Sequence, residues 1–214
     1  MIRVAFDVGG TFTDLIAVLD DGRAVIHKTP STPDDPSRAA ISGLKELLQR
    51  LGAKGGDVTE LLHGSTIVAN SLIQRRGAKV ALLTTAGFRD VLELGRRTRP
   101  NPYGLIGSFE PLISREYRLE VPERMDADGK VVTALDEGAV RRAAAELVEM
   151  GCESLVIHFL HAYANSSHEV RAAEIAAEVW PNSHITRGSA ILAEFREYER
   201  GVAAAVNAAI QPVL

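Results

Sequence analysis

The stretch that decides the fold is Arg3–Asp20, R-V-A-F-D-V-G-G-T-F-T-D-L-I-A-V-L-D. Two apolar runs flank Gly9-Gly10, and this pattern predicts a tight β-hairpin of two buried strands with the glycines as its turn. Paired glycines leave backbone N–H groups free to face an anion, and the hydroxyls of Thr11 and Thr13 add further donors. The turn is therefore a candidate phosphate-binding loop.

Two acids flank this turn, Asp7 before it and Asp14 after it. A carboxylate at the position of Asp7 can hold Mg²⁺, usually through water, because this ion keeps much of its hydration shell. We therefore predict a polyphosphate with Mg²⁺ as the ligand. The alternative is an ordinary turn in which Asp7 only ends a strand. The stretch is neither a P-loop, since it lacks G-K-[ST], nor the dinucleotide-binding fingerprint.

The composition is that of an ordinary globular protein. The 214 residues are 46% hydrophobic and 24% charged, with a formal net charge of −4, which gives no general attraction to nucleic acid or membrane. The single cysteine, Cys152, excludes an intramolecular disulfide and suits a reducing compartment. Because there is no apolar run of 18 residues and no secretory signal pattern, we expect a soluble, cytoplasmic protein.

Beyond the hairpin, strand and helix signals alternate along the chain, which favours a parallel or mixed sheet in an α/β protein. Further strands are expected at Ala24–Lys28, Leu61–Thr66, Lys79–Thr85, Glu116–Glu123, Val131–Thr133, Leu155–Leu160 and Ile185–Thr186. Helices are expected from Pro36 to Gly52, from Gly87 to Leu94, and at Val68–Arg76, Glu137–Met150, Glu169–Val179 and Glu194–Gln211.

Other polar groups have two interpretations each. His63-Gly64-Ser65-Thr66 lies where a strand leads into a helix, so it either contributes to a ligand site or only caps the helix. Arg96, Arg97 and Arg99 either hold an anionic group or form a solvated basic loop.

Charged and histidine-containing segments later in the chain leave similar choices. The near-terminal Arg196 and Arg200 either lie on a solvated helix face or face a cleft or partner domain. His158, His161 and His168 fit no known metal-ligand spacing, so core or loop positions are expected for them.

Several stretches together resemble the N-terminal region of the hydantoinase A/5-oxoprolinase family. They are D-V-G-G-T-F-T-D, H-G-S-T-I-V-A-N, R-R-G-A-K-V-A-L-L-T-T-A-G-F-R-D-V-L-E-L-G-R, E-R-M-D-A-D-G-K-V and S-A-I-L-A-E-F-R-E-Y-E-R. That family includes subunits of acetone and acetophenone carboxylases and lies in the actin, sugar-kinase and heat-shock ATPase superfamily.

The resemblance implies a fold and its divisions. The expected fold is a ribonuclease H-like mixed sheet flanked by helices, the first half of an actin-like ATPase, with an inserted or appended smaller α/β segment. Residues 1–191 would form the family's N-terminal domain, with a phosphate-loop core at 1–95, a loop and hairpin at 96–135 and an α/β continuation at 136–191. Residues 192–214 would be a helix leading into a second ATPase half that this chain lacks.

The resemblance also implies a function. The expected enzyme uses ATP and Mg²⁺ to activate a cyclic amide, of the hydantoin, N-methylhydantoin or 5-oxoproline type, by phosphorylating its oxygen. A hydantoinase B-type subunit or domain and an oligomeric assembly are expected, and these residues alone would be inactive. One alternative is a ketone carboxylase subunit that forms an enol phosphate, and another is a non-catalytic assembly module.

Site residues follow position by position from the same resemblance. Asp7 would be the catalytic, Mg²⁺-side carboxylate. The expected phosphate cradle is Gly9, Gly10, Thr11 and Thr13, supported by Asp14. Arg96 would be a second catalytic residue, and the substrate side would comprise His63, Thr66, Asn70, Arg89 and Asp90.

Overall fold

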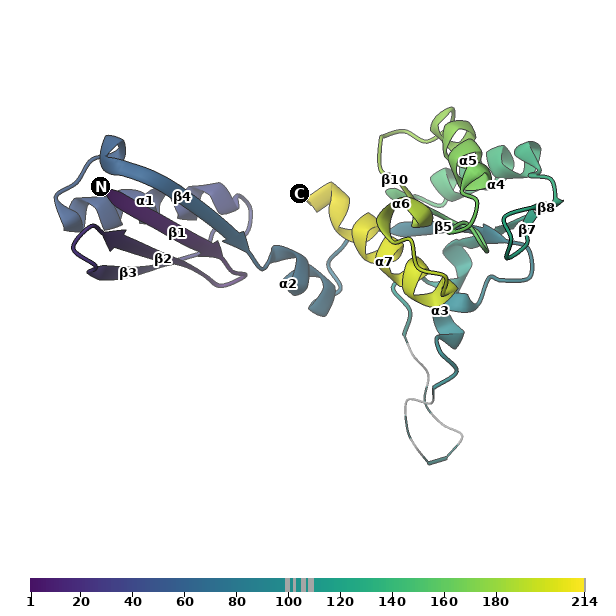
Figure 1. The fold of residues 1–214 in the computed structure, drawn as a ribbon, viewed down its shortest axis with the longest axis horizontal. Helices are drawn as coiled ribbons and strands as arrows, with labels where there is room; N and C mark the ends of the chain where they lie inside the picture. The colour runs from purple at the N-terminus through teal and green to yellow at the C-terminus, as the bar shows by residue number, and fades with distance from the viewer. Residues whose placement is uncertain (99–100, 102, 105–106, 108–109, 214) are drawn as a thin grey trace. The chain divides into compact units, whose positions relative to one another are not determined.

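The computed structural model describes residues 1–98, 101, 103–104, 107 and 110–213, which form two compact units, Met1–Arg76 and Gly77–Leu214 (Figure 1). Both combine sheets with helices, which confirms the predicted α/β class. The finer division at residues 95, 135 and 191 stays a prediction.

The first unit contains a mixed four-stranded sheet. Its strands are β1 (Ile2–Val8), β2 (Phe12–Leu19), β3 (Ala24–Pro30) and β4 (Val58–Ser65), in the order β3-β2-β1-β4. The first three strands form an antiparallel meander, and β4 runs parallel to β1. The predicted hairpin between β1 and β2 is confirmed, with residues 9–11 as its connection.

Helix α1 (Pro36–Leu51) covers one face of this sheet (Figure 1). The helix begins where the Asp35 carboxylate accepts a hydrogen bond from the Ser37 amide and ends at Gly52, whose φ of 63° is left-handed. Its Leu47 and Leu48 pack with the strand residues Val4, Leu15 and Ala17 to form the core. A 3₁₀ turn, η1 (Gly55–Asp57), precedes β4, and the short helix α2 (Ile67–Ile73) follows it.

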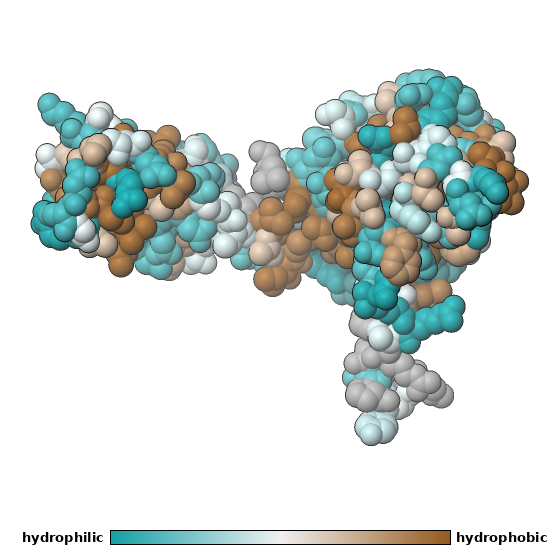
Figure 2. All heavy atoms as spheres, viewed as in Figure 1, coloured by the Kyte–Doolittle hydropathy of each residue, from teal (hydrophilic) through white to brown (hydrophobic). Residues whose placement is uncertain are grey.

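The opposite face of the sheet is open in this unit. Thr13, Leu15 and Ala17 of β2 are buried against α1, whereas Asp14 and Ile16 are exposed. The prediction of two buried strands therefore holds for only one face of β1 and β2, because α1 covers only one side of the pleat and leaves Asp7 and Asp14 exposed. Apolar side chains remain exposed in this unit, including Ile26, Leu61 and Leu62. Figure 2 shows hydrophobic residues among the hydrophilic ones on the surface of this unit.

The second unit contains a parallel sheet with the strand order β10-β9-β5-β6. Its strands are β5 (Val80–Thr85), β6 (Arg118–Val121), β9 (Ser154–His158) and β10 (Ile185–Arg187), and every residue of β5 and β9 is buried. A separate hairpin is formed by β7 (Arg124–Met125) and β8 (Val131–Thr133).

Helices cover both faces of this parallel sheet. The helices are α3 (Val91–Leu94), α4 (Glu137–Glu149), α5 (Ser167–Ala177), α6 (Gly188–Ile191) and α7 (Glu197–Ile210), with 3₁₀ turns η2 (Arg115–Tyr117) and η3 (Gln211–Val213). Ala81 and Leu83 pack with α4 and α5, and Leu82 packs with α3 and α7. Helix α6 was not predicted, and α7 begins three residues after its predicted start.

Among the helices of the described residues, none combines the length and apolar character needed to cross a membrane.

Candidate functional site

The glycine turn joins β1 to β2 and is closed by one backbone hydrogen bond, between Gly9 and Phe12. The Gly9 N–H donates to Phe12 O at 3.0 Å. A Cβ at Gly9 would lie 2.8 Å from that same oxygen, and a Cβ at Gly10 would lie 3.2 Å from Asn70 Nδ2. Real Cβ atoms do not approach backbone oxygen so closely, so the turn requires glycine at position 9 for space.

A row of charged residues crosses the open face of the sheet next to this turn. The strand register places Lys28 opposite Asp14, Asp14 opposite Asp7, and Asp7 opposite Gly64. Lys28 Nζ lies 2.8 Å from Asp14 Oδ1. Asp7 is exposed, and its carboxylate forms no hydrogen bond or ion pair with the described residues. Two carboxylates thus face each other, and the cation neutralises one of them.

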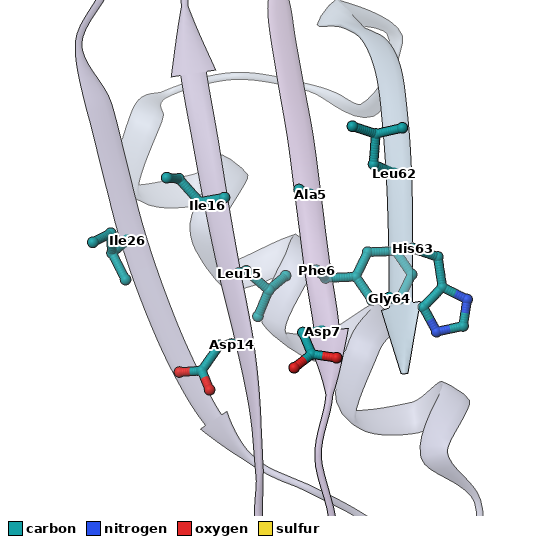
Figure 3. Close-up of a pocket in the computed structure, with 10 residues that line it drawn as sticks. All are labelled: Ala5, Phe6, Asp7, Asp14, Leu15, Ile16, Ile26, Leu62, His63 and Gly64. Carbon is teal, nitrogen blue, oxygen red and sulfur yellow. The ribbon is translucent and has the colours of Figure 1, made fainter. Parts of the chain in front are cut away.

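A shallow pocket of about 410 Å³ extends from these carboxylates along the open face (Figure 3). Ile26, Ile16, Ala5 and Leu62 form the next row across all four strands. The pocket therefore has an apolar floor with a free carboxylate at the end nearest the glycine turn.

The segment after β4 reaches the turn from the other side. The Thr66 N–H donates to Val8 O at 3.2 Å, and Asn70 Nδ2 donates to Thr66 Oγ1 at 3.1 Å. The ring of His63 stacks on Phe6, with centroids 4.6 Å apart and planes 19° apart (Figure 3). The structure thus brings His63, Thr66 and Asn70 close to the C-terminal part of β1, which leads into the glycine turn.

The position of the Thr13 side chain differs from the sequence prediction, in which its hydroxyl contacts the phosphate directly. Its side chain is fully buried on the α1 side, and its hydroxyl lies 3.0 Å from Ser31 Oγ. Ser31 Oγ in turn donates to Gly9 O at 2.7 Å. Thr13 therefore supports the turn from inside the unit, because a side chain with no exposed surface cannot touch a bound phosphate.

Sequence reasoning did not assign any role to Ser31. Its only signal is a hydroxyl in the proline-containing loop after β3, at the position that continues the β2–β3 register opposite Thr11. That signal appears only once the register of the two strands is known.

The remaining predicted residues, Arg89, Asp90 and Arg96, belong to the second unit. Arg89 Nη2 donates to Arg115 O at 2.9 Å, and Arg115 Nε donates to Asp90 Oδ1 at 2.8 Å. The hydrogen bond from Arg115 holds the pKa of Asp90 below its ordinary value. Arg96 pairs with Glu199. Arg97 has a left-handed φ of 57°, and Arg99 lies outside the described residues.

A buried polar cluster at the carboxyl end of β9 contains Arg200. This residue is fully buried and donates to the carbonyl oxygens of Phe159 and Glu194, at 3.0 and 2.6 Å. The interpretations made from the sequence, a solvated face or a side chain facing a cleft or partner domain, are therefore wrong for Arg200, because no part of it is exposed. Its guanidinium satisfies carbonyl groups of the segments that follow β9 and precede α7.

His158 and Glu169 complete this cluster. Burial, together with the charge of Arg200, lowers the pKa of His158 to about 3. Burial raises the pKa of Glu169, although its carboxylate accepts hydrogen bonds from the Phe159 and Ser189 amides. Across the described residues no group of three or more His, Cys, Asp or Glu side chains is arranged to hold a metal ion.

Comparisons with known proteins agree with this fold. Residues 3–180 match the hydantoinase/oxoprolinase N-terminal region. The nucleotide-free structure of acetone carboxylase superposes on 98% of the chain with a TM-score of 0.87 and 26% identity, covering 32% of that protein. Fold and turn together define an α/β protein with a glycine hairpin, of the kind found in the N-terminal part of acetone carboxylase.

The chain belongs to the hydantoinase/oxoprolinase family. It is 31% identical to the caprolactamase subunit alpha of Pseudomonas jessenii over 99% of its own length and 32% of that protein. The crystal structure of ATP-dependent caprolactamase gives a TM-score of 0.85 at 32% identity, covering 99% of this chain and 32% of that one. The acetophenone carboxylase gamma subunit of Aromatoleum aromaticum is 32% identical over 97% of the chain and 31% of that protein. The chain thus spans about a third of the length of these relatives.

Proposed function

We propose that this chain is the N-terminal, ATP-binding part of an ATP-dependent enzyme that hydrolyses a cyclic amide. The observation that carries the proposal is the exposed, unpaired carboxylate of Asp7 next to a turn that only glycine fits. Membership of a family that contains an ATP-dependent caprolactamase supports it. The cyclic-amide substrate, an oligomeric assembly, a B-type partner subunit and the cytoplasmic location are parts of the proposal.

The residues of the first unit fit a Mg²⁺-bound polyphosphate. Glycines at positions 9 and 10 leave the backbone open to an anion, with the exposed Thr11 beside them. Asp7 would hold Mg²⁺ through water, and this outer-shell contact needs no cage of protein ligands. Asp14 supports this arrangement from the neighbouring strand, held in place by Lys28.

When bound, ATP with Mg²⁺ would supply the phosphoryl group, which on the amide oxygen makes the amide carbon a better electrophile for water. In such a transfer the protein mainly positions groups and neutralises charge. We assign positioning of the substrate to Thr66 and Asn70, which lie next to the turn, and to His63, which stacks on Phe6 of β1. In the second unit, we assign Arg96 to the phosphoryl group, because a guanidinium fork matches phosphate oxygens. Arg89 and Asp90 are assigned to the substrate.

A second candidate is the ketone carboxylase branch, in which an enol oxygen receives the phosphoryl group. The identity with the acetophenone carboxylase gamma subunit favours it as strongly as the caprolactamase match favours the first. A third candidate is an assembly module without nucleotide.

Calorimetry and turnover assays on the full-length protein with its partner subunit separate these candidates. Binding of Mg·ATP, followed by ATP hydrolysis that depends on caprolactam, hydantoin or 5-oxoproline, is expected for the amide hydrolase. Hydrolysis that requires acetophenone and bicarbonate would instead identify the carboxylase. If no heat of Mg·ATP binding is measured at any concentration, the assembly module is the remaining function.

A further inference from the structure

Ser31 contacts three alternate residues, Gly9 and Thr11 of the glycine turn and Thr13 at the start of β2. Its hydroxyl donates to Gly9 O at 2.7 Å, and its amide donates to Thr11 O at 2.9 Å. Thr13 Oγ1 lies 3.0 Å from Ser31 Oγ. A serine hydroxyl has a single proton. Because Gly9 O takes it, Thr13 must be the donor to Ser31, and the two hydroxyl contacts form one directed chain from Thr13 through Ser31 to Gly9 O.

The first of these contacts changes how the turn is closed. In a two-residue hairpin the carbonyl of the first residue usually accepts from the N–H of the fourth. Here Gly9 O accepts from Ser31, and within the described part of the chain no bond runs from the Phe12 N–H to Gly9 O. Ser31 therefore holds the Gly9 carbonyl on its own side, where it does not meet the Phe12 N–H.

The same contacts fix the direction of the turn's amides. A trans peptide is planar, so its C=O and the following N–H point in opposite directions. Ser31 holds the carbonyls of Gly9 and Thr11 on its own side. The N–H groups of Gly10 and Phe12 consequently point away from Ser31, and neighbouring N–H groups that point one way form an anion-binding concavity.

We propose that Ser31 is a positioning residue for the phosphate loop, which it holds open so that the Gly10 and Phe12 amides face the phosphates. This inference rests on the proposed function, because it needs a bound polyphosphate. Ser31 does not touch the ligand; it acts through the Gly9 carbonyl, and Thr13 keeps the Ser31 hydroxyl in place.

The test compares Ser31→Ala with Ser31→Thr in the full-length protein, using calorimetry with Mg·ATP. Loss of the hydroxyl should weaken Mg·ATP binding about five- to tenfold, the size of one neutral hydrogen bond, and threonine should retain wild-type affinity. Ser42→Ala is the matched control, since the Ser42 hydroxyl donates only to carbonyls within α1, and its affinity should not change.

Hydrogen exchange of the Phe12 amide provides a second readout without nucleotide. In Ser31→Ala the closing bond to Gly9 O can form, so this amide should exchange several times more slowly than in the wild type. If Ser31→Ala does not fold, Ser31→Cys keeps the shape with a weaker donor and should give intermediate affinity.

The outcomes keep the two proposals apart. If the wild type fails to bind Mg·ATP, the proposed function is wrong, and the exchange measurement alone then decides the role of Ser31. If the wild type binds but Ser31→Ala binds equally well, or threonine does not restore affinity, the role of Ser31 is refuted. Unchanged exchange of the Phe12 amide refutes it as well.

Discussion

Arg96 forms an ion pair with Glu199, a residue 103 positions further along the chain. The preceding residue, Gly95, lies against Tyr198, so that a Cβ there would be 3.6 Å from the tyrosine ring. Two segments that resemble family motifs therefore meet inside the second unit. Arg96, expected from the resemblance to be catalytic, has a structural partner, and the two roles need to be separated by experiment.

A charge swap separates the catalytic role of Arg96 from its structural role. Arg96→Ala should lower the free energy of unfolding by only about 0.5–1 kcal/mol, because the pair is partly exposed and screened by solvent. The double variant Arg96→Glu with Glu199→Arg should restore this stability but not ATP turnover. Urea unfolding, followed by the fluorescence of Trp180, the single tryptophan, measures the free energy of unfolding. Recovery of turnover in the double variant would show that Arg96 acts only in the fold.

Asp7→Asn tests the Mg²⁺-side carboxylate. The variant should weaken Mg·ATP binding about tenfold or more, because a neutral amide holds a hydrated divalent cation poorly. Stability should stay equal or rise slightly, since two carboxylates opposite each other in a sheet repel. Asp21→Asn, in the turn at the far end of β2, is the matched control and should bind like the wild type. Normal affinity in Asp7→Asn would exclude this residue from the site.

Lys28→Met tests the charge balance of the row that crosses the open face. Without Lys28, Asp14 and Asp7 face each other unopposed, so we expect the amides of β2 to lose about 0.5–1 kcal/mol of protection against hydrogen exchange. The loss should shrink in high salt, which screens exposed charges. Lys45→Met, an exposed position on α1, should show neither effect, and a loss that does not respond to salt would point to packing of the lysine stem instead.

The buried His158 predicts a pH dependence of stability. Its pKa is about 3 in the folded protein, below the ordinary 6.5. The stabilisation that it contributes as a neutral ring is therefore present above pH 6.5 and is lost as the pH falls toward 3. Because the unfolded chain binds one more proton in this window, stability should fall by about 1.4 kcal/mol per pH unit from this group.

His158→Gln should remove that part of the slope. The free energy of unfolding of both proteins, measured by urea and Trp180 fluorescence between pH 7 and pH 4, should converge as the pH falls. Parallel curves over the whole range would contradict the buried neutral state of His158. Glu169, whose folded pKa is raised, acts in the opposite direction and loses stabilisation as the pH rises through that value, so it does not account for convergence at low pH.

The sequence by itself determined the elements whose signals are local. Gly9-Gly10 between apolar runs identified the first hairpin, and Asp35-Pro36 with Gly52 bounded α1. Such signals depend on turn geometry, capping and side-chain periodicity, which act over a few residues. The family, and with it the α/β class, also followed from short stretches of sequence.

Only the tertiary structure decided which groups are free and which are occupied. The β2–β3 register, with Phe12 opposite Pro30, brings Ser31 to the glycine turn and buries Thr13. The packing of α7 on β9 turns Arg200 from an apparent surface charge into a donor for Phe159 O. These contacts join residues far apart in the chain, and a hydroxyl or guanidinium has the same local sequence signal whether it faces water, a ligand or a buried carbonyl. Which of these partners it meets is fixed by register and packing.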